Sequence, residues 1–309
     1  MRILRHRWRK SDETDNLNPY LQSGGGVLLQ LYDSLKKQTC KDFEWLIVDD
    51  GSKDNTREVV KSWLSDSDFP IQYFFKENGG KHTALNYAVK KIKSELTFIV
   101  DSDDTLTADA VETVLRYHRR YKDEENICGY VFLRAYPDGI VNGKEFVPNE
   151  RVASYTEARV NSDDTMADKA EVFKTDCLRE FPFPEYQGEK FLGEDIVWVR
   201  MARKYMMVHI NKIVYIGNYQ DDGLTKNRRL NNIKSPIGCM NRAKEFMGLE
   251  FKKKYRVKAT LQYIIYGKFA GISIAEILKA TPDRALTLVC LIPGLILQKS
   301  WKRKFCSNR

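Results

Sequence analysis

Residues 96–104 read Leu-Thr-Phe-Ile-Val-Asp-Ser-Asp-Asp, an apolar run that ends in three acids, Asp101, Asp103 and Asp104. A short β-branched and aromatic run bounded by polar residues is typical of a buried strand in a parallel sheet. Open α/β sheets bind ligands beyond the carboxyl ends of their strands, so these acids lie where a ligand is expected. A polar turn followed by a helix cap is the alternative, because Asp favours both positions.

The spacing of Asp101 and Asp103 points to a cation. Two carboxylates this close repel each other unless a positive charge shares their site. Carboxylate oxygens suit Mg²⁺ or Mn²⁺, which commonly bind together with substrate phosphates. The stretch therefore predicts a divalent-metal site that serves a diphosphate-containing substrate.

A second apolar run, residues 43–48, also ends in acids, Asp49 and Asp50, and a helical pattern follows over residues 57–64. A third strand is expected over residues 71–75, followed by a helix with an apolar face over residues 84–92. Alternating strands and helices indicate βαβ units and a parallel sheet. The acids of the first and last strands should therefore meet at one edge of that sheet.

Five segments together resemble the family 2 glycosyltransferases of the GT-A fold, in order and in spacing: residues 38–52, 78–86, 101–104, 193–195 and 219–225. The resemblance extends over residues 27–230. It implies an α/β fold with a Rossmann-like, mostly parallel sheet flanked by helices. It also implies a metal-dependent, inverting, hexosyltransferase-like enzyme in cell-surface polysaccharide synthesis. The donor would be a nucleotide-sugar, with a UDP-sugar favoured, and the acceptor a hydroxyl of a glycan or lipid-linked molecule.

The resemblance also implies roles in donor binding. Asp50, with Asp49 beside it, would contact the uracil or ribose of the nucleotide-sugar. Asp101 would bind the ribose and Asp103 the metal. Lys81 resembles the family's basic residue near the nucleotide. The alternatives are a turn residue for Asp49 and an exposed lysine at a helix start for Lys81.

The pair Glu194-Asp195 opens another predicted helix. The helix dipole alone could explain acids at this position. The resemblance implies that Asp195 is the catalytic base, with Glu194 as its orienting neighbour or as the second candidate base. Trp198, one turn further on, resembles an aromatic residue that often floors the acceptor site, although a position in the core would suit it equally.

Residues 217–229 resemble the family's lid, a loop that folds over the donor. Arg228 and Arg229 are its candidate contacts to the diphosphate. Lids that exclude water are common in transferases, where hydrolysis competes with transfer. An ordinary solvated loop is the alternative.

The composition indicates a globular protein. The chain has 309 residues, of which 42% are hydrophobic, enough for a sizeable core. Its six cysteines lack metal-ligand spacing, which predicts free thiols and a reducing, cytoplasmic location. We expect no signal peptide, because the basic start lacks an apolar segment. No apolar run approaches the length of about 20 residues needed to cross a bilayer.

The net charge of +9 is concentrated toward the C-terminus, in residues 252–258 and 299–304. These basic segments flank an apolar run over residues 286–297. The pattern predicts either docking onto an anionic membrane surface, at its cytoplasmic face, or a helical hairpin packed on the catalytic domain with solvated lysines. A nucleic-acid partner is not expected, because no recognition motif is present.

The N-terminal residues depart from the resemblance. The family begins with a buried central strand, but residues 6–26 show no such pattern, and only residues 1–4 are weakly apolar. We therefore expect this strand to be missing or replaced. The expected organisation is an irregular leader (1–26), a catalytic domain (27–230) with nucleotide-binding (27–125) and acceptor (126–230) halves, and a basic helical region (231–309).

Two alternative functions remain open. The chain could be a crippled, non-catalytic relative that lost nucleotide binding with its first strand. It could also be a sugar nucleotidyltransferase, which would release diphosphate. Enzymes of that class usually have a Gly-rich loop with Lys or Arg after the first strand, and no such loop is present.

Overall fold

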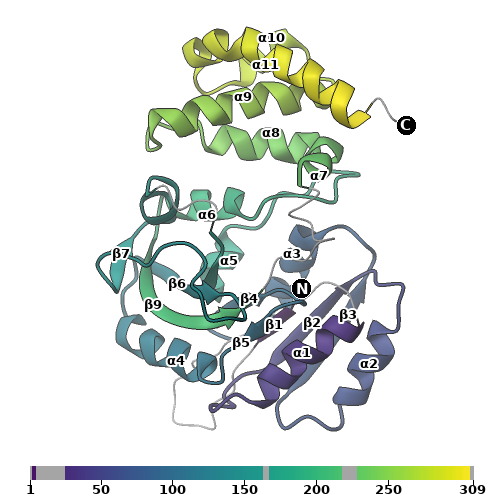
Figure 1. The fold of residues 1–309 in the computed structure, drawn as a ribbon, viewed down its shortest axis with the longest axis vertical. Coiled ribbons are helices and arrows are strands. Elements are labelled where there is room, and N and C mark those ends of the chain that lie inside the picture. Colours follow the sequence, from purple (N-terminus) through teal and green to yellow (C-terminus); the bar gives the residue numbers. More distant parts are fainter. Residues whose placement is uncertain (1, 5–24, 163–166, 218–227, 307–309) are drawn as a thin grey trace. The chain divides into compact units, whose positions relative to one another are not determined.

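The computed structural model describes residues 2–4, 25–162, 167–217 and 228–306. The chain divides into two compact units: residues 1–182 with 201–218, and residues 183–200 with 219–309. Every described strand lies in the first unit, and the second is built of helices (Figure 1).

The strands are β1 (Arg2–Leu4), β2 (Trp45–Asp50), β3 (Ile71–Lys76), β4 (Leu96–Val100), β5 (Thr105–Leu106), β6 (Ile127–Ala135), β7 (Arg151–Ala153), β8 (Lys169–Lys174) and β9 (Met206–Ile216). The helices of the first unit are α1 (Gly25–Lys36), α2 (Thr56–Trp63), α3 (Lys81–Lys91), α4 (Ala110–Tyr121), a π-helical turn (Thr156–Val160) and α5 (Thr175–Glu180). The predicted α/β architecture is confirmed.

The strand directions differ from the prediction of a mostly parallel sheet. β2 and β3 pair in parallel, as the βαβ pattern predicts. The larger sheet has the order β1-β4-β8-β6-β9-β5, with β7 beside β9. Among its described ladders β6–β9 is parallel and the others are antiparallel. The prediction of a mostly parallel sheet is therefore wrong for the described ladders, because β1, β5, β7 and β8 run antiparallel to the strands with which they pair.

The first strand is short and runs against its neighbour. β1 pairs antiparallel with β4, so that Ile3 lies opposite Ile99. In the described part of the chain, this segment occupies the edge of β4, and no parallel strand precedes α1. Most of the segment for which we expected the family's first strand to be missing or replaced, residues 5–24, lies outside the described residues, so that expectation stays a prediction.

An aromatic cluster holds α1 and α2 against β2. The rings of Tyr32 and Trp63 stack with their centroids 4.3 Å apart, and Trp45 lies 5.8 Å from Trp63. All three side chains are buried. Such pairs contribute about 0.5–1.5 kcal/mol each beyond their area burial. This packing fixes the strand that ends in Asp49 and Asp50.

The central strands β4 and β6 are buried along almost their whole length. β6 approaches β8 closely at Gly129, where a Cβ atom would come within 2.1 Å of the Val172 carbonyl oxygen. β6 also carries a charged residue, Arg134, which is 8% exposed. A buried charge in an apolar strand needs partners, and these partners belong to the site described below.

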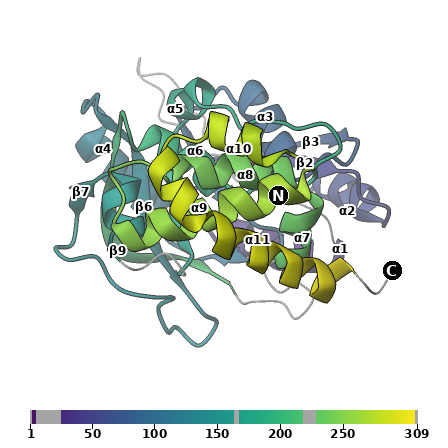
Figure 2. The same ribbon diagram turned by 90° about the horizontal axis from the view of Figure 1, so that it is seen from above.

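The second unit contains α6 (Asp195–Met201), α7 (Arg228–Lys234), α8 (Pro236–Glu245), α9 (Lys253–Phe269), α10 (Ile274–Ala280) and α11 (Arg284–Cys306). α9 lies between α8 and α11, as Figures 1 and 2 show. Buried side chains of all these helices from α8 to α11, among them Met240, Tyr263, Ile264 and Ile277, form one core. The predicted helical C-terminal region is confirmed.

Two further expectations can be compared with the structure. All six cysteines are free thiols, as predicted. Within the described ranges, each helix falls short of the combined length and apolarity that a bilayer crossing requires.

Candidate functional site

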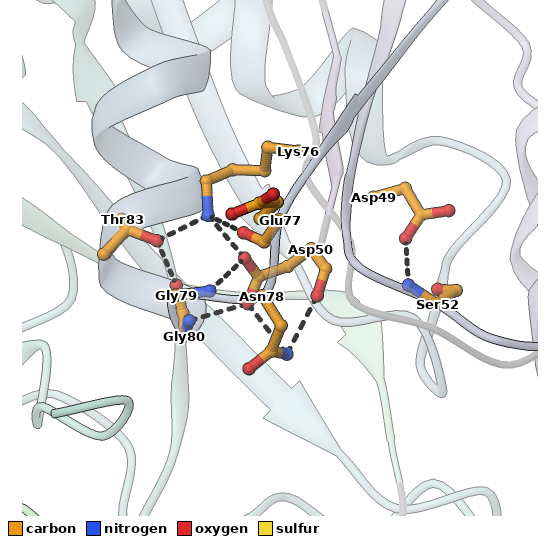
Figure 3. A network of polar contacts seen from close by, with 9 residues as sticks. All are labelled: Asp49, Asp50, Ser52, Lys76, Glu77, Asn78, Gly79, Gly80 and Thr83. Carbon is orange, nitrogen blue, oxygen red and sulfur yellow. Dashed lines mark hydrogen bonds and ion pairs between the residues drawn. The ribbon is translucent and has the colours of Figure 1, made fainter. Parts of the chain in front are cut away.

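Asp50, the last residue of β2, organises the loop between β3 and α3 (Figure 3). Its Oδ1 accepts hydrogen bonds from Lys76 Nζ at 2.6 Å and from the Gly79 amide at 2.9 Å, while its Oδ2 accepts from the Gly80 amide at 2.7 Å. The Asn78 side chain donates to the Asp50 carbonyl at 2.8 Å. The carboxylate is 0% exposed. Asp50 therefore fixes the shape of this loop through charge-assisted hydrogen bonds.

Glycines make the close fit of this loop possible. Gly80 has a φ of 94° and Gly51 a φ of 81°, values that favour glycine. A Cβ atom at Gly51 would come within 2.8 Å of the Asn78 amide nitrogen. The Asp49-Asp50-Gly51-Ser52 and Asn78-Gly79-Gly80 segments of the sequence are thus two sides of one contact.

Asp49 stabilises the turn after β2. Its Oδ1 accepts a hydrogen bond from the Ser52 amide at 2.7 Å, and its Oδ2 accepts one from the Tyr73 hydroxyl at 2.6 Å. Burial, reinforced by this hydrogen bond to a carboxylate, raises the pKa of Tyr73 to about 12. These contacts match the turn-residue alternative for Asp49, and its contact to a nucleotide stays a prediction.

Lys81 and Asp101 form an ion pair across the carboxyl ends of the strands. Lys81 is the first residue of α3, and its Nζ lies 2.7 Å from Oδ1 of Asp101, which directly follows β4. Partial loss of hydration would by itself raise the pKa of Asp101, but the charge and the hydrogen bond of Lys81 outweigh it and hold that pKa below its usual value. The side chains are 23% and 42% exposed, so both remain accessible to a ligand.

Beneath this pair lies a buried network that the sequence did not predict. The Tyr215 hydroxyl donates to Asp104 Oδ2 at 2.8 Å and accepts from the Asp101 amide at 2.9 Å. Arg134 Nη2 donates to Asp104 Oδ1 at 3.1 Å. Burial raises the pKa of Asp104 to about 7 against the opposing charge of Arg134, with repulsion from neighbouring acids adding to the rise. The network fixes the backbone from which the predicted metal ligand projects.

Asp103 lies between Asp101 and Asp104 in the sequence. Burial and the like charge of Asp101 both raise the pKa of Asp103. A cation would relieve this repulsion, so the donor set fits a divalent metal. In residues 2–4, 25–162, 167–217 and 228–306, no three or more His, Cys, Asp or Glu side chains are grouped to hold a metal. A metal at Asp103 would therefore draw most of its ligands from phosphate oxygens and water, as Mg²⁺ usually does.

In the second unit, Asp195 begins α6 and is held by Arg242 of α8. Arg242 Nε donates to Oδ1 of Asp195 and Nη2 donates to Oδ2, a two-pronged pairing. Burial alone would raise the pKa of Asp195, but Arg242 outweighs it, and the charge of Arg228 lowers the pKa further. Asp195 is therefore ionised at neutral pH and fixed in orientation.

Glu194 and Trp198, the neighbours of Asp195 in the sequence, are also described. Glu194 directly precedes α6. Trp198 is 5% exposed and packs edge-on against Phe183, with ring centroids 5.7 Å apart. This matches the core alternative for Trp198, and contact with an acceptor stays a prediction.

Only the two ends of the predicted lid can be described. Arg228 and Arg229 begin α7, and residues 218–227 lie outside the described part of the chain. The Arg229 guanidinium lies 4.4 Å from the ring centroid of Trp301, a cation–π contact. At the other end, a Cβ atom at Gly217 would come within 2.0 Å of Asp104 Oδ1.

The predicted residues are divided between the two units: Asp49, Asp50, Lys81, Asp101 and Asp103 belong to the first, and Glu194, Asp195, Trp198, Arg228 and Arg229 to the second. Sequence reasoning missed Lys76, Arg134, Tyr215 and Arg242. A signal existed for two of them. Lys76 ends a strand, as the predicted acids do, and Arg134 interrupts an apolar strand. Nothing in the sequence marks Arg242, which lies 47 residues after Asp195.

Comparison with known proteins adds the following. The model of the family described as glycosyl transferase family 2 matches residues 20–162. An uncharacterized glycosyltransferase of Rickettsia typhi is 34% identical over 113 residues, which are 36% of this chain and 34% of that protein. Chondroitin synthase of Pasteurella multocida is 31% identical over 247 residues, 75% of this chain and 24% of the synthase. The chain thus spans about a third or less of the length of these two relatives.

Solved structures share the fold. S. aureus TarS 1–349 in complex with UDP-GlcNAc superposes with a TM-score of 0.62 at 14% identity, covering 93% of this chain and 91% of TarS 1–349. The mannosyltransferase PcManGT of Pyrobaculum calidifontis, in complex with GDP-Man and Mn²⁺, superposes with a TM-score of 0.54 at 15% identity, covering 92% of this chain and 82% of that protein. At these identities the likeness concerns the fold.

Proposed function

Since the chain belongs to glycosyl transferase family 2 and has the GT-A fold, we propose that it is a metal-dependent, inverting enzyme that uses a nucleotide-sugar donor. The acceptor in this proposal is a hydroxyl group of a glycan or lipid-linked molecule, in cell-surface polysaccharide synthesis. The observation that carries the proposal is the ion pair of Lys81 and Asp101 beside Asp103, at the carboxyl end of β4. That position is where open α/β sheets bind their ligands.

In the proposed donor site, both members of the ion pair, Lys81 and Asp101, contact the nucleotide-sugar. Asp101 would accept hydrogen bonds from the ribose, and Lys81 would lie near the diphosphate. Asp103 would hold Mn²⁺ or Mg²⁺, which supplies Lewis-acid stabilisation of the leaving diphosphate when bound. Asp50 would act by fixing the glycine loop that leads into Lys81, with Asp49 supporting the adjoining turn.

The chemical step of this proposal rests on Asp195. Its carboxylate would take the proton of the acceptor hydroxyl as that oxygen attacks the anomeric carbon. The bond from the anomeric carbon to the diphosphate oxygen breaks in the same displacement, which inverts the configuration. The pairing with Arg242 supports this role, because it keeps Asp195 ionised and oriented, with Glu194 next to it. Trp198, Arg228 and Arg229 are proposed contacts to acceptor and diphosphate.

The donor nucleotide is proposed to be UDP. TarS was solved with UDP-GlcNAc, whereas the mannosyltransferase was solved with GDP-Man and Mn²⁺, so both nucleotides belong in the test. The proposed location is the cytoplasm, at the inner face of the membrane, where lipid-linked acceptors would be available.

Calorimetric titration of the purified protein with UDP and with GDP, each with and without Mn²⁺, tests the proposal. We expect binding of UDP that requires the metal, and loss of that binding in Asp103→Asn. Asp195→Asn should bind UDP as the wild type does, yet fail to transfer sugar to any acceptor that the wild type uses. Asp66→Asn, a change at an exposed acid outside the site, is the matched control.

Three results would count against the proposal. Equal binding of UDP with and without Mn²⁺ would contradict the proposed metal dependence. Sugar transfer by Asp195→Asn would contradict the role of Asp195 as the catalytic base. A folded protein that binds neither nucleotide would favour the non-catalytic relative instead.

A further inference from the structure

The outward face of α11 is divided along its length into an apolar part and a basic part. Over residues 288–297 it exposes five large apolar side chains: Leu288 (52% exposed), Val289 (76%), Ile292 (70%), Ile296 (62%) and Leu297 (38%). Over the last two turns it exposes Lys299, Lys302, Arg303 and Lys304. The helical repeat of 3.6 residues puts Leu288, Ile292, Lys299 and Arg303 on the same side.

The opposite face of α11 fixes the orientation of this surface. Thr287, Cys290 and Gly294 are buried. A Cβ atom at Gly294 would come within 2.9 Å of Ile264 Cγ2, so α11 and α9 are in close contact there. The Trp301 ring lies 6.1 Å from the ring of Tyr266 on α9. The exposed apolar residues therefore lie on a second face of α11, on the side away from the residues that pack against α9.

The charge of α11 indicates what covers this face. The helix contains no acidic residue between Arg284 and Cys306, while basic residues stand at both of its ends. A contiguous apolar surface of this kind marks an interaction site. A second copy of the chain could cover the apolar part but would give its basic part no acidic partner on α11. An anionic lipid surface complements both parts at once.

We propose that α11 is the membrane-contacting helix of this protein, lying in the plane of an anionic lipid surface. Leu288, Val289, Ile292 and Ile296 enter the boundary between headgroups and acyl chains, and Lys299 and Arg303 bind lipid phosphates. The helix lies on the bilayer and does not cross it, in keeping with its limited apolar length. This inference concerns α11 alone and holds whether or not the active site transfers sugar.

Co-sedimentation of the full chain with lipid vesicles tests the proposal without donor or acceptor. We compare vesicles of phosphatidylcholine with vesicles that also contain phosphatidylglycerol. The protein should bind the anionic vesicles, bind the neutral ones weakly, and lose affinity as salt screens the charges. Ile292→Ser with Ile296→Ser removes the apolar part, and Lys299→Ala with Arg303→Ala removes the basic part. Each pair should lower partitioning by about tenfold or more.

The control variant carries Lys37→Ala and Lys61→Ala, which remove the same charge from exposed lysines of the first unit and should bind as the wild type does. All substituted side chains are exposed, so melting temperatures should be unchanged. If the variant with Ile292→Ser and Ile296→Ser bound vesicles as the wild type does, charge attraction alone would explain the binding, and the proposed insertion would be overturned. Absence of binding to anionic vesicles would overturn the proposal. So would a dimer of the wild type in analytical ultracentrifugation that the Ile292→Ser and Ile296→Ser variant does not form.

Discussion

The Arg242 guanidinium holds both carboxylate oxygens of Asp195 and lowers the pKa of that acid. Lysine cannot reproduce a two-pronged pairing, because it presents a single ammonium group. In Arg242→Lys and Arg242→Ala the pKa of Asp195 should rise, with the larger rise in Arg242→Ala. A carboxylate base with a raised pKa is protonated at a higher pH. The acid limb of the pH profile of sugar transfer should therefore move to higher pH.

The pH dependence of kcat/KM for donor turnover measures this shift. Arg200→Lys, which disturbs the comparable ion pair of Arg200 with Glu245 in the same unit, serves as the control. An acid limb that stays in place in Arg242→Ala would argue against Asp195 as the titrating base.

Removal of the Asp50 carboxylate should destabilise the first unit. Asp50→Ala leaves the amides of Gly79 and Gly80 and the Lys76 ammonium without their shared acceptor. Each buried donor left unsatisfied costs about 1–3 kcal/mol, so we expect the free energy of unfolding to fall by about 3 kcal/mol. Urea denaturation followed by circular dichroism measures the loss. Asp66→Ala, at an exposed position, should change the stability little, and equal stability of the two variants would contradict the structural role of Asp50.

Gly217→Ala tests the close packing under Asp101. The new Cβ atom would come within 2.0 Å of Asp104 Oδ1 and 2.4 Å of Arg134 Nη2, so it would push this ion pair apart. Overpacking of this kind costs about 1–3 kcal/mol, which should appear as a lower melting temperature. Gly139→Ala is the comparison, because alanine at Gly139 is strained by a φ of 84° but no atom lies within 4 Å of the added methyl, so this variant measures backbone strain without a clash. A smaller loss in Gly217→Ala than in Gly139→Ala would refute the predicted clash.

His209 should make the protein sensitive to acid. Burial lowers the pKa of His209 from 6.5 to about 4 in the folded state. Between these values the unfolded chain binds the proton and the folded chain does not, so stability falls as the pH drops from 6.5 toward 4. At 1.36 kcal/mol per unit, the loss is about 3 kcal/mol. Chemical denaturation at pH 7 and pH 4.5 measures it, and His209→Gln should show a smaller loss over the same interval.

The apolar runs of the sequence predicted β2 and β4 closely, because a strand buried on both faces needs an unbroken series of apolar residues. The same runs placed Asp101 and Asp103 at a sheet edge. The direction of the later strands could not be read in this way, since burial is equal for parallel and antiparallel neighbours. The pairing of Asp195 with Arg242 could not be predicted either, because these residues are 47 positions apart in the sequence and meet only through the packing of α6 and α8.

The contacts of Asp50 have a consequence for amide hydrogen exchange. Glycine-rich loops ordinarily exchange their amide protons with solvent quickly, because no partner holds them. Gly79 and Gly80 instead donate to one carboxylate that solvent does not reach. Their amides should exchange as slowly as those of a strand, and only when β2 separates from the loop. The loop leading into α3 would then open with the sheet and would not open by itself.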